Sequence, residues 1–207
     1  MGKSSKALFN MILGSSSFAR RQILSQMGYE FSILTADIDE KSIRKEKPEE
    51  LVTALAQAKA DAILEKLQKS GELQHVDSKG PTLLITADTV VVYKGKVQEK
   101  PTSVGEARKF IEGYSGSHAA VVGSVLVTNI TTGKRRGSWE HAEVYFHEIP
   151  SEIIDGLIAD EVTYRVAGGL TVEHPLTSPF IQSVVGNTDT VMGLPIALTE
   201  KLIADCL

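Results

Sequence analysis

The stretch that most constrains the fold is residues 82–98, "TLLITADTVVVYKGKVQ". It is rich in apolar and β-branched residues and ends in a Lys-Gly pair typical of a tight turn, so it predicts a β-hairpin whose first strand is central to a sheet. One carboxylate, Asp88, lies inside this apolar run. Burying an unpaired charge is very costly. Asp88 is therefore either a polar residue at a strand end, or a metal ligand or a base that activates water.

Helices and strands alternate on both sides of this hairpin. Further strands are predicted over 8–14, 29–38, 119–128, 140–149 and 179–186, and helices over 18–27, 48–70, 103–116, 150–161 and 195–207. Ser17 is the expected cap of the first helix, and a surface loop is expected over 70–81. This order predicts an α/β fold with a mixed sheet, in a single domain over residues 1–207 that has two lobes.

Composition and charge exclude several classes of function. The net charge of −4 disfavours a nucleic-acid polymer as partner, so an anionic ligand must be met by a few placed cations or by a metal. The five histidines show no zinc-binding spacing. The single cysteine, Cys206, favours a reducing compartment, and the apolar run near the N-terminus is too short for a membrane span. We therefore expect a cytoplasmic protein with no membrane partner.

Small hydroxyls and cations lie together in "ILGSSSFARRQIL", residues 12–24, where a strand is expected to turn into a helix. Amides at a helix N-terminus carry partial positive charge, the serines let a phosphate approach, and Arg20 or Arg21 offers a planar fork of donors. The segment therefore suits a polyphosphate. A capped turn with surface arginines is the alternative, and no GxxxxGK[ST] or GxGxxG pattern occurs in the chain.

A lysine interrupts the apolar stripe of the long helix over 48–70. Leu51, Leu55, Lys59 and Ile63 are spaced by four residues, so Lys59 lies on the apolar face. Its ammonium group either points inward toward a partner or extends along the surface to water.

Two further segments carry candidate charges. "ADIDEKS" places Asp37, Asp39 and Glu40 after an expected strand, and such hard oxygen ligands either bind a divalent cation or form an ordinary acidic loop. "GKVQEKP" places Lys100 before a proline, whose ring favours an extended backbone at the lysine.

Taken in order, several motifs resemble the Maf family of nucleoside triphosphate pyrophosphatases. The motifs are "GSSSFARRQIL", "DIDE", "LAQAKA", "TADTVVV", "KVQEKP", "YSGSH", "AGGLTVEHP" and "VVGNTDTVMGLP". The resemblance covers about residues 10–200. It implies a long twisted mixed sheet with flanking helices, two lobes around a cleft as in inosine triphosphate pyrophosphatases, and a homodimer. It also implies metal-dependent hydrolysis of a nucleoside triphosphate to monophosphate and pyrophosphate, a house-cleaning role toward non-standard nucleotides.

The resemblance assigns roles to the same residues that stand out chemically. It implies that Asp88 and Glu40 are catalytic and hold Mg²⁺ or Mn²⁺, with Asp88 as the general base. The side chains that would bind the triphosphate are Ser15, Arg20, Lys59 and Lys100. The positive charges would neutralise the leaving pyrophosphate, which is electrostatic positioning rather than covalent catalysis.

The chain departs from the family pattern at informative positions. Phe18 replaces a proline and Ala19 replaces a cation in the first motif. Glu173 stands where relatives that prefer thymidine or uridine nucleotides carry glutamine. A carboxylate only accepts hydrogen bonds and therefore suits the N1 and N2 donors of guanine. We therefore predict that Glu173 binds the base of 7-methyl-GTP or of another guanine-like nucleotide.

Two other functions use the same residues. A phosphatase of a small phosphorylated metabolite would release orthophosphate rather than pyrophosphate. A nucleotide-binding regulator of cell division would bind a triphosphate without metal-dependent turnover.

Overall fold

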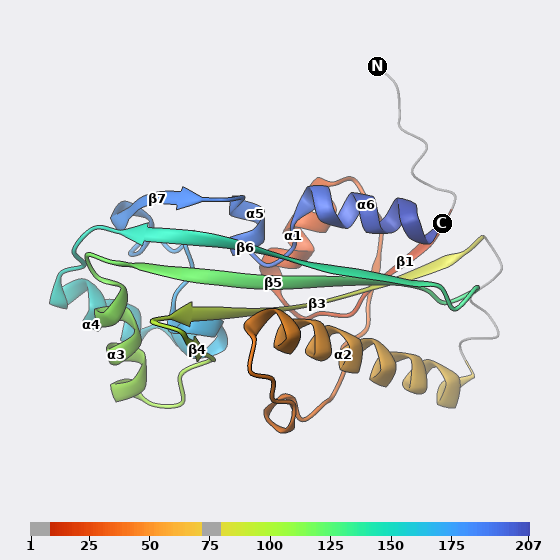
Figure 1. Cartoon of the computed structure of the whole chain (residues 1–207), viewed down its shortest axis with the longest axis horizontal. Helices are drawn as coiled ribbons and strands as arrows, with labels where there is room; N and C mark the ends of the chain where they lie inside the picture. Colours follow the sequence, from red (N-terminus) through yellow and green to blue (C-terminus); the bar gives the residue numbers. More distant parts are fainter. Residues whose placement is uncertain (1–8, 72–79) are drawn as a thin grey trace, which may run out of the picture. The chain divides into compact units, whose positions relative to one another are not determined.

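The computed structural model describes residues 9–71 and 80–207 (Figure 1). Most of the loop predicted over 70–81 lies outside these residues. The strands are β1 (Asn10–Leu13), β2 (Ser32–Ile33), β3 (Thr82–Tyr93), β4 (Lys96–Gln98), β5 (His118–Asn129), β6 (Arg135–Phe146) and β7 (Ile181–Val185). The α-helices are α1 (Phe18–Gln26), α2 (Pro48–Ser70), α3 (Val104–Tyr114), α4 (Ser151–Ala159), α5 (Thr188–Val191) and α6 (Ile196–Cys206). The 3₁₀ helices are η1 (Glu40–Ser42), η3 (Glu161–Arg165), η4 (Ala167–Gly169) and η5 (Ser178–Phe180).

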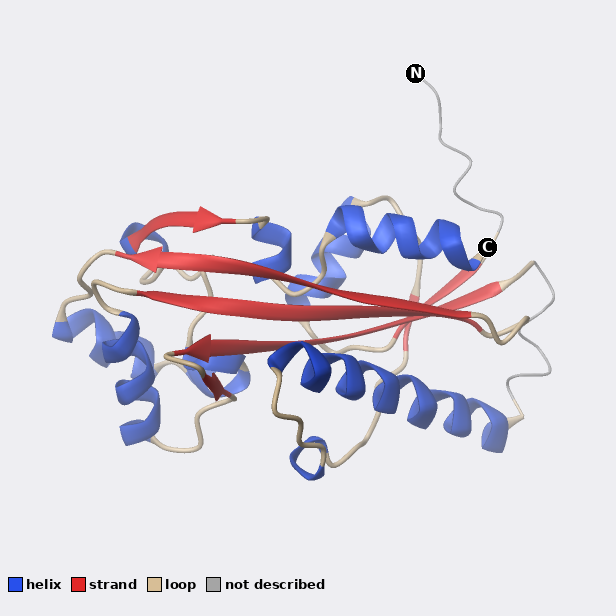
Figure 2. Cartoon of the chain, in the orientation of Figure 1, coloured by secondary structure: helices blue, strands red, loops and turns tan. Residues whose placement is uncertain are grey.

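The strands form one mixed sheet in the order β2-β1-β3-β5-β6-β7, with β4 paired to β3. β1 is parallel to both β2 and β3, whereas β4 and β7 are antiparallel to their neighbours. Figure 2 shows these strands with helices beside them. The predicted mixed α/β fold is therefore confirmed.

The hairpin and the long helix agree with the sequence-based expectations. Lys94 and Gly95 both have positive φ, 47° and 73°, as a two-residue turn between twisted strands requires. α2 begins at Pro48, whose missing amide proton costs nothing at a helix start, and it ends at Gly71 in the left-handed conformation.

The strand predicted over 29–38 is wrong in its extent, because β2 holds only Ser32 and Ile33. β2 pairs with Ile12 and Leu13 of β1, and the Leu34 amide still donates to the Leu13 carbonyl at 3.1 Å, but within the described residues the strand continues no further. The short helix α5 and the 3₁₀ helices were not predicted, since single turns carry no clear hydrophobic period.

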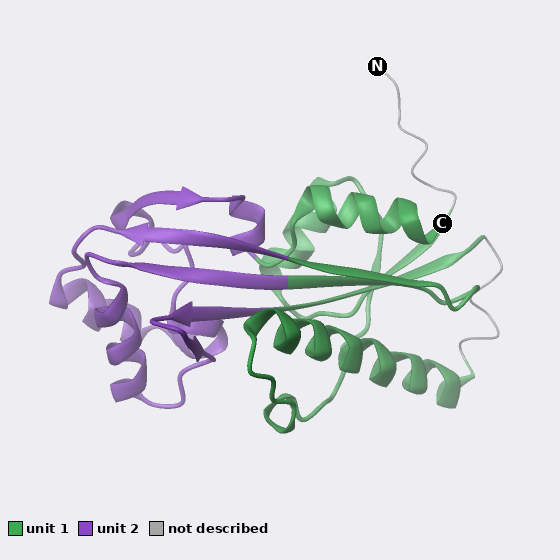
Figure 3. Cartoon of the chain, in the orientation of Figure 1, with its two compact units in different colours: residues 1–88, 124–139, 193–207 green, residues 89–123, 140–192 purple. Residues whose placement is uncertain are grey.

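The chain divides into two compact units (Figure 3). The first holds residues 1–88, 124–139 and 193–207, and the second holds residues 89–123 and 140–192. In the first unit, α2 lies along one side of the strands and α6 on the other (Figure 2). The α2 side is a cluster of seven buried residues: Ile12, Ala56, Ala60, Ile63, Leu67, Leu84 and Leu126.

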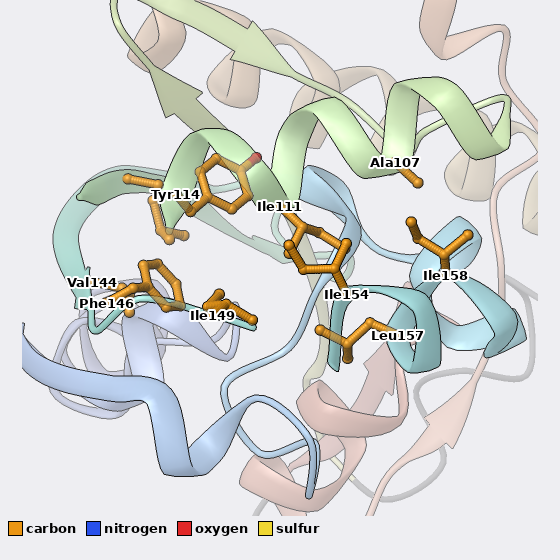
Figure 4. Close-up of a cluster of buried hydrophobic side chains, with 11 residues drawn as sticks. Ala107, Ile111, Tyr114, Val144, Phe146, Ile149, Ile154, Leu157 and Ile158 are labelled. Carbon is orange, nitrogen blue, oxygen red and sulfur yellow. The ribbon is translucent and has the colours of Figure 1, made fainter. Parts of the chain in front are cut away.

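The second unit has its own apolar core (Figure 4). Side chains of α3 and α4 meet those of β5 and β6 there, and Tyr114 stacks on Phe146 with ring centroids 6.0 Å apart. The residues with predicted site roles that fall in this unit are Lys100 and Glu173.

No helix within residues 9–71 and 80–207 is both long enough and apolar enough to cross a bilayer.

Candidate active site

Three predicted site residues meet in the first unit around one ammonium group. Lys59 Nζ lies 2.5 Å from Asp88 Oδ1 and 2.8 Å from Glu40 Oε1. The side chains of Lys59 and Asp88 are 14% and 10% exposed, whereas that of Glu40 is 43% exposed. Lys59 therefore points inward to a partner rather than out to water.

Each of these charges is delivered by a different element. Asp88 lies in the buried part of β3, where alternate side chains face α2. Lys59 lies on the apolar stripe of α2, as the spacing of four predicts. Glu40 opens η1, whose preceding residue Asp39 caps the turn by accepting a hydrogen bond from the Lys41 amide. Of the three acids in "DIDE", Glu40 alone forms an ion pair with Lys59 within the described residues.

The loop before α1 adds Ser15 and Arg20. Ser17 caps the helix as predicted, since its side chain accepts from the Arg20 amide. The Arg20 guanidinium donates to Ser15 Oγ at 3.3 Å, to the Ala87 carbonyl at 3.0 Å and to the Gly193 carbonyl at 2.9 Å. Ser15 is buried. Arg20 thus connects the serine loop, the residue before Asp88 and the segment before α6.

Burial and nearby carboxylates act in opposite directions on Arg20. Desolvation lowers the pKa of its guanidinium, and the negative charges of Asp88 and Glu40 raise it. Arginine nevertheless stays protonated at neutral pH because its pKa begins so high. The site therefore combines two cations, Arg20 and Lys59, with two carboxylates.

The donor set fits a divalent cation that takes its remaining ligands from phosphate oxygens. Oδ1 of Asp88 and Oε1 of Glu40 converge on one cationic group, Lys59 Nζ, and Mg²⁺ is commonly held by one or two carboxylates together with substrate phosphates. Within the described part of the chain, no three His, Cys, Asp or Glu side chains gather as an all-protein metal cluster. An ion here would thus depend on the bound substrate for several of its ligands.

Lys100 and Glu173 belong to the second unit, where both are exposed. Lys100 follows β4 and precedes the buried Pro101. Glu173 lies in the turn between η4 and η5, next to His174, whose Nε2 is 3.1 Å from Asp160 Oδ2. The roles of Lys100 and Glu173 in binding substrate stay predictions.

Sequence reasoning missed the polar contacts that join α2 to the sheet. Thr86 Oγ1 donates to the Ala56 carbonyl at 2.8 Å, and Ser124 Oγ donates to the Val52 carbonyl at 2.6 Å. The available signal was alternation, because Thr86 is two residues before Asp88 and must share its face of the strand. The partner carbonyls carry no signal in the sequence.

Comparison with known proteins identifies the family. The profile of the family described as "Maf-like protein" matches residues 10–206. The chain belongs to the Maf family. This membership confirms the resemblance that the ordered motifs indicated.

Relatives of this Maf chain carry related names. A 7-methyl-GTP pyrophosphatase of Dictyostelium discoideum is 39% identical over 194 residues, which cover 94% of this chain and 95% of the relative. A dTTP/UTP pyrophosphatase of Chelativorans sp. (strain BNC1) is 34% identical over 94% of this chain and 90% of the relative. The solved dITP/XTP pyrophosphatase of Mycobacterium abscessus covers 95% of this chain and 94% of its own length, with a TM-score of 0.36 and 10% identity. A likeness that low carries no conclusion.

Proposed function

We propose that this Maf chain hydrolyses a nucleoside triphosphate to the monophosphate and pyrophosphate. The observation that carries the proposal is the inward-facing Lys59 held between Asp88 and Glu40, beside the Ser15–Arg20 pair, in a chain whose relatives are named as pyrophosphatases. Cations and carboxylates placed together in this way suit a reaction that develops charge on phosphate oxygens.

The reaction needs one proton acceptor and several positive charges. Water attacks the α-phosphorus, the bond from that phosphorus to the bridging oxygen breaks, and pyrophosphate leaves with the electron pair. Asp88 accepts the proton of the attacking water through a carboxylate oxygen. Ser15, Arg20, Lys59 and Lys100 bind the phosphates and neutralise the charge that gathers on the leaving group.

Asp88 and Glu40 are the residues that would hold Mg²⁺ or Mn²⁺, since their oxygens converge within the site. When bound, such an ion supplies positive charge to the phosphate oxygens. Lys59 then keeps the two carboxylates oriented and contributes its own charge to the triphosphate.

The first test is product analysis with a panel of normal and modified nucleoside triphosphates. We expect pyrophosphate release with Mg²⁺ or Mn²⁺ and loss of turnover, by at least about 100-fold, in excess EDTA, because the substrate charge is then left without a metal counter-ion. Release of orthophosphate instead would favour the metabolite phosphatase. Tight triphosphate binding without turnover would favour the non-catalytic regulator of cell division.

The base preference rests on Glu173. We propose a guanine-like base, and the 39% identical relative carries the name 7-methyl-GTP pyrophosphatase. A carboxylate accepts from two guanine donors, and the positive charge of an N7-methylated guanine strengthens that pairing.

Glu173→Gln is expected to lower kcat/KM for 7-methyl-GTP by about 10- to 100-fold relative to dTTP and UTP, the size of one or two charge-assisted hydrogen bonds. The measurement is the ratio of kcat/KM values for the three substrates. Glu30→Gln removes the same charge from an exposed residue of the first unit and serves as the control. An unchanged ratio in Glu173→Gln would remove Glu173 from base recognition.

A homodimer and a cytoplasmic location stay predictions. The first is tested by the mass of the protein in solution, and the second by fractionation of the cells that make it.

A further inference from the structure

On the face of β3 that meets α2, the side chains change from apolar to polar between residues 84 and 88. Residues 84, 86 and 88 share one side of the strand because side chains alternate. Leu84 lies in the apolar cluster with α2, Thr86 follows it, and Asp88 contacts Lys59. The same strand face therefore makes an apolar contact, a hydroxyl contact and an ionic contact with one helix.

The hydroxyl contact is fully buried. Thr86 is 0% exposed and its partner residue Ala56 is 1% exposed, so water does not replace this hydrogen bond. The Ala56 carbonyl also accepts the intrahelical bond expected from the amide four residues later. Valine would match the volume of Thr86 without a polar atom, so packing alone does not require the hydroxyl here.

Thr86 and Lys59 act on neighbouring points of α2. Ala56 precedes Lys59 by three residues and therefore lies on the same face of the helix. Side chains of a helix lean toward its N-terminus, so the Lys59 side chain reaches back along the turn that Thr86 holds. A shift of α2 along β3 would change the Thr86–Ala56 and Lys59–Asp88 distances together.

Gly14 lies beside Thr86 on the face of the sheet that meets α2. A Cβ atom at Gly14 would lie 2.6 Å from Thr86 Cγ2 and 2.7 Å from Ile63 Cδ1, so Thr86 and Ile63 occupy the space that a side chain at this position would need. The Gly14 amide also donates to the Ile85 carbonyl at 2.7 Å. Thr86 is thus confined between α2 and the residue that precedes Ser15.

We propose that Thr86 is a positioning residue, which fixes the register of α2 on β3 and so holds Lys59 against Asp88. The inference rests on the proposed function, because it assigns Thr86 an effect on the same reaction. Thr86 acts through the Ala56 carbonyl and contacts neither substrate nor reacting atoms.

Ser124 supplies a matched control on the same helix. Its Oγ donates to the Val52 carbonyl, and Ser124 is 2% exposed, so this bond is as buried as that of Thr86. Val52 lies seven residues before Lys59, about two helical turns away. Ser124→Ala therefore removes a similar bond farther from the site.

The test compares Thr86→Val, Thr86→Ser and Ser124→Ala for triphosphate hydrolysis, with thermal unfolding of each variant. Thr86→Val is expected to lower kcat about tenfold or more while KM changes less, because misplacement of catalytic groups slows the reaction step. Thr86→Ser keeps the hydroxyl and is expected to restore most of the kcat. Ser124→Ala is expected to lower the melting temperature by a similar amount to Thr86→Val and to keep kcat within about twofold of the parent.

A double variant decides whether the effect passes through Lys59. In a Lys59→Met background, Thr86→Val is expected to lower kcat no further, since the group that it positions is gone. Equal losses in both backgrounds, or equal kcat losses in Ser124→Ala and Thr86→Val, would overturn the proposal. A parent protein that cleaves no triphosphate would instead overturn the proposed function, so the two failures are distinguishable.

Discussion

Asp88→Asn is expected to lower kcat for pyrophosphate release by roughly 10³-fold, within the range that a general base contributes. The amide has the shape of the carboxylate and still offers an oxygen to Lys59 Nζ, but it cannot take a proton from water. KM is expected to change much less, because the cations that bind the triphosphate remain. The measurement is steady-state kinetics with the metal and substrate that the panel identifies.

The control for Asp88→Asn is Asp61→Asn. Asp61 lies on α2 with an exposed side chain and pairs with Arg135 at 2.7 Å, so its variant loses a surface ion pair outside the site. Such pairs contribute about 0–1 kcal/mol to stability, and kcat is expected to stay unchanged. If Asp88→Asn kept kcat within about tenfold of the parent, another group would be the base, since general bases contribute at least about 10²-fold.

The charged residues of the site could be predicted from the sequence because they violate its local patterns. Asp88 interrupts an apolar strand and Lys59 interrupts an apolar helical stripe, and an enclosed charge needs a partner. The structure confirms that these two residues are that partner for each other. The pairing itself could not be predicted, because it depends on the register of α2 against β3, which is a tertiary property.

Other parts of the site had no such local signal. Arg20 donates to the backbone carbonyls of Ala87 and Gly193. Every residue has such a carbonyl, whatever its side chain, so the sequence cannot indicate which carbonyls accept these bonds. The extent of β2 depends on its pairing with Ile12 and Leu13 of β1, which is a tertiary property. The alternation of side chains along β3 puts Thr86 on the same strand face as Asp88. Which carbonyl of α2 accepts the Thr86 hydrogen bond depends, again, on the register of the helix against the strand.

Lys59→Met tests the electrostatic basis of the whole site. Methionine keeps an unbranched side chain on the apolar stripe but removes the cation that lies between Asp88 and Glu40. Loss of one partner from a buried pair costs about 3–5 kcal/mol, and the partial exposure of Glu40 reduces this to about 1–3 kcal/mol. The melting temperature is then expected to fall by about 3–10 °C at neutral pH, and kcat/KM by at least about 100-fold.

A bound divalent cation should offset this loss. Mg²⁺ or Mn²⁺ is expected to raise the melting temperature of Lys59→Met more than that of the parent, because the ion replaces the positive charge that the variant lacks between the two carboxylates. Lys66→Met removes an exposed lysine of the same helix and should show no such difference. A deficit in melting temperature that the metal does not reduce would mean that Lys59 contributes packing rather than charge, and Asp88 and Glu40 would then not form a shared cation site.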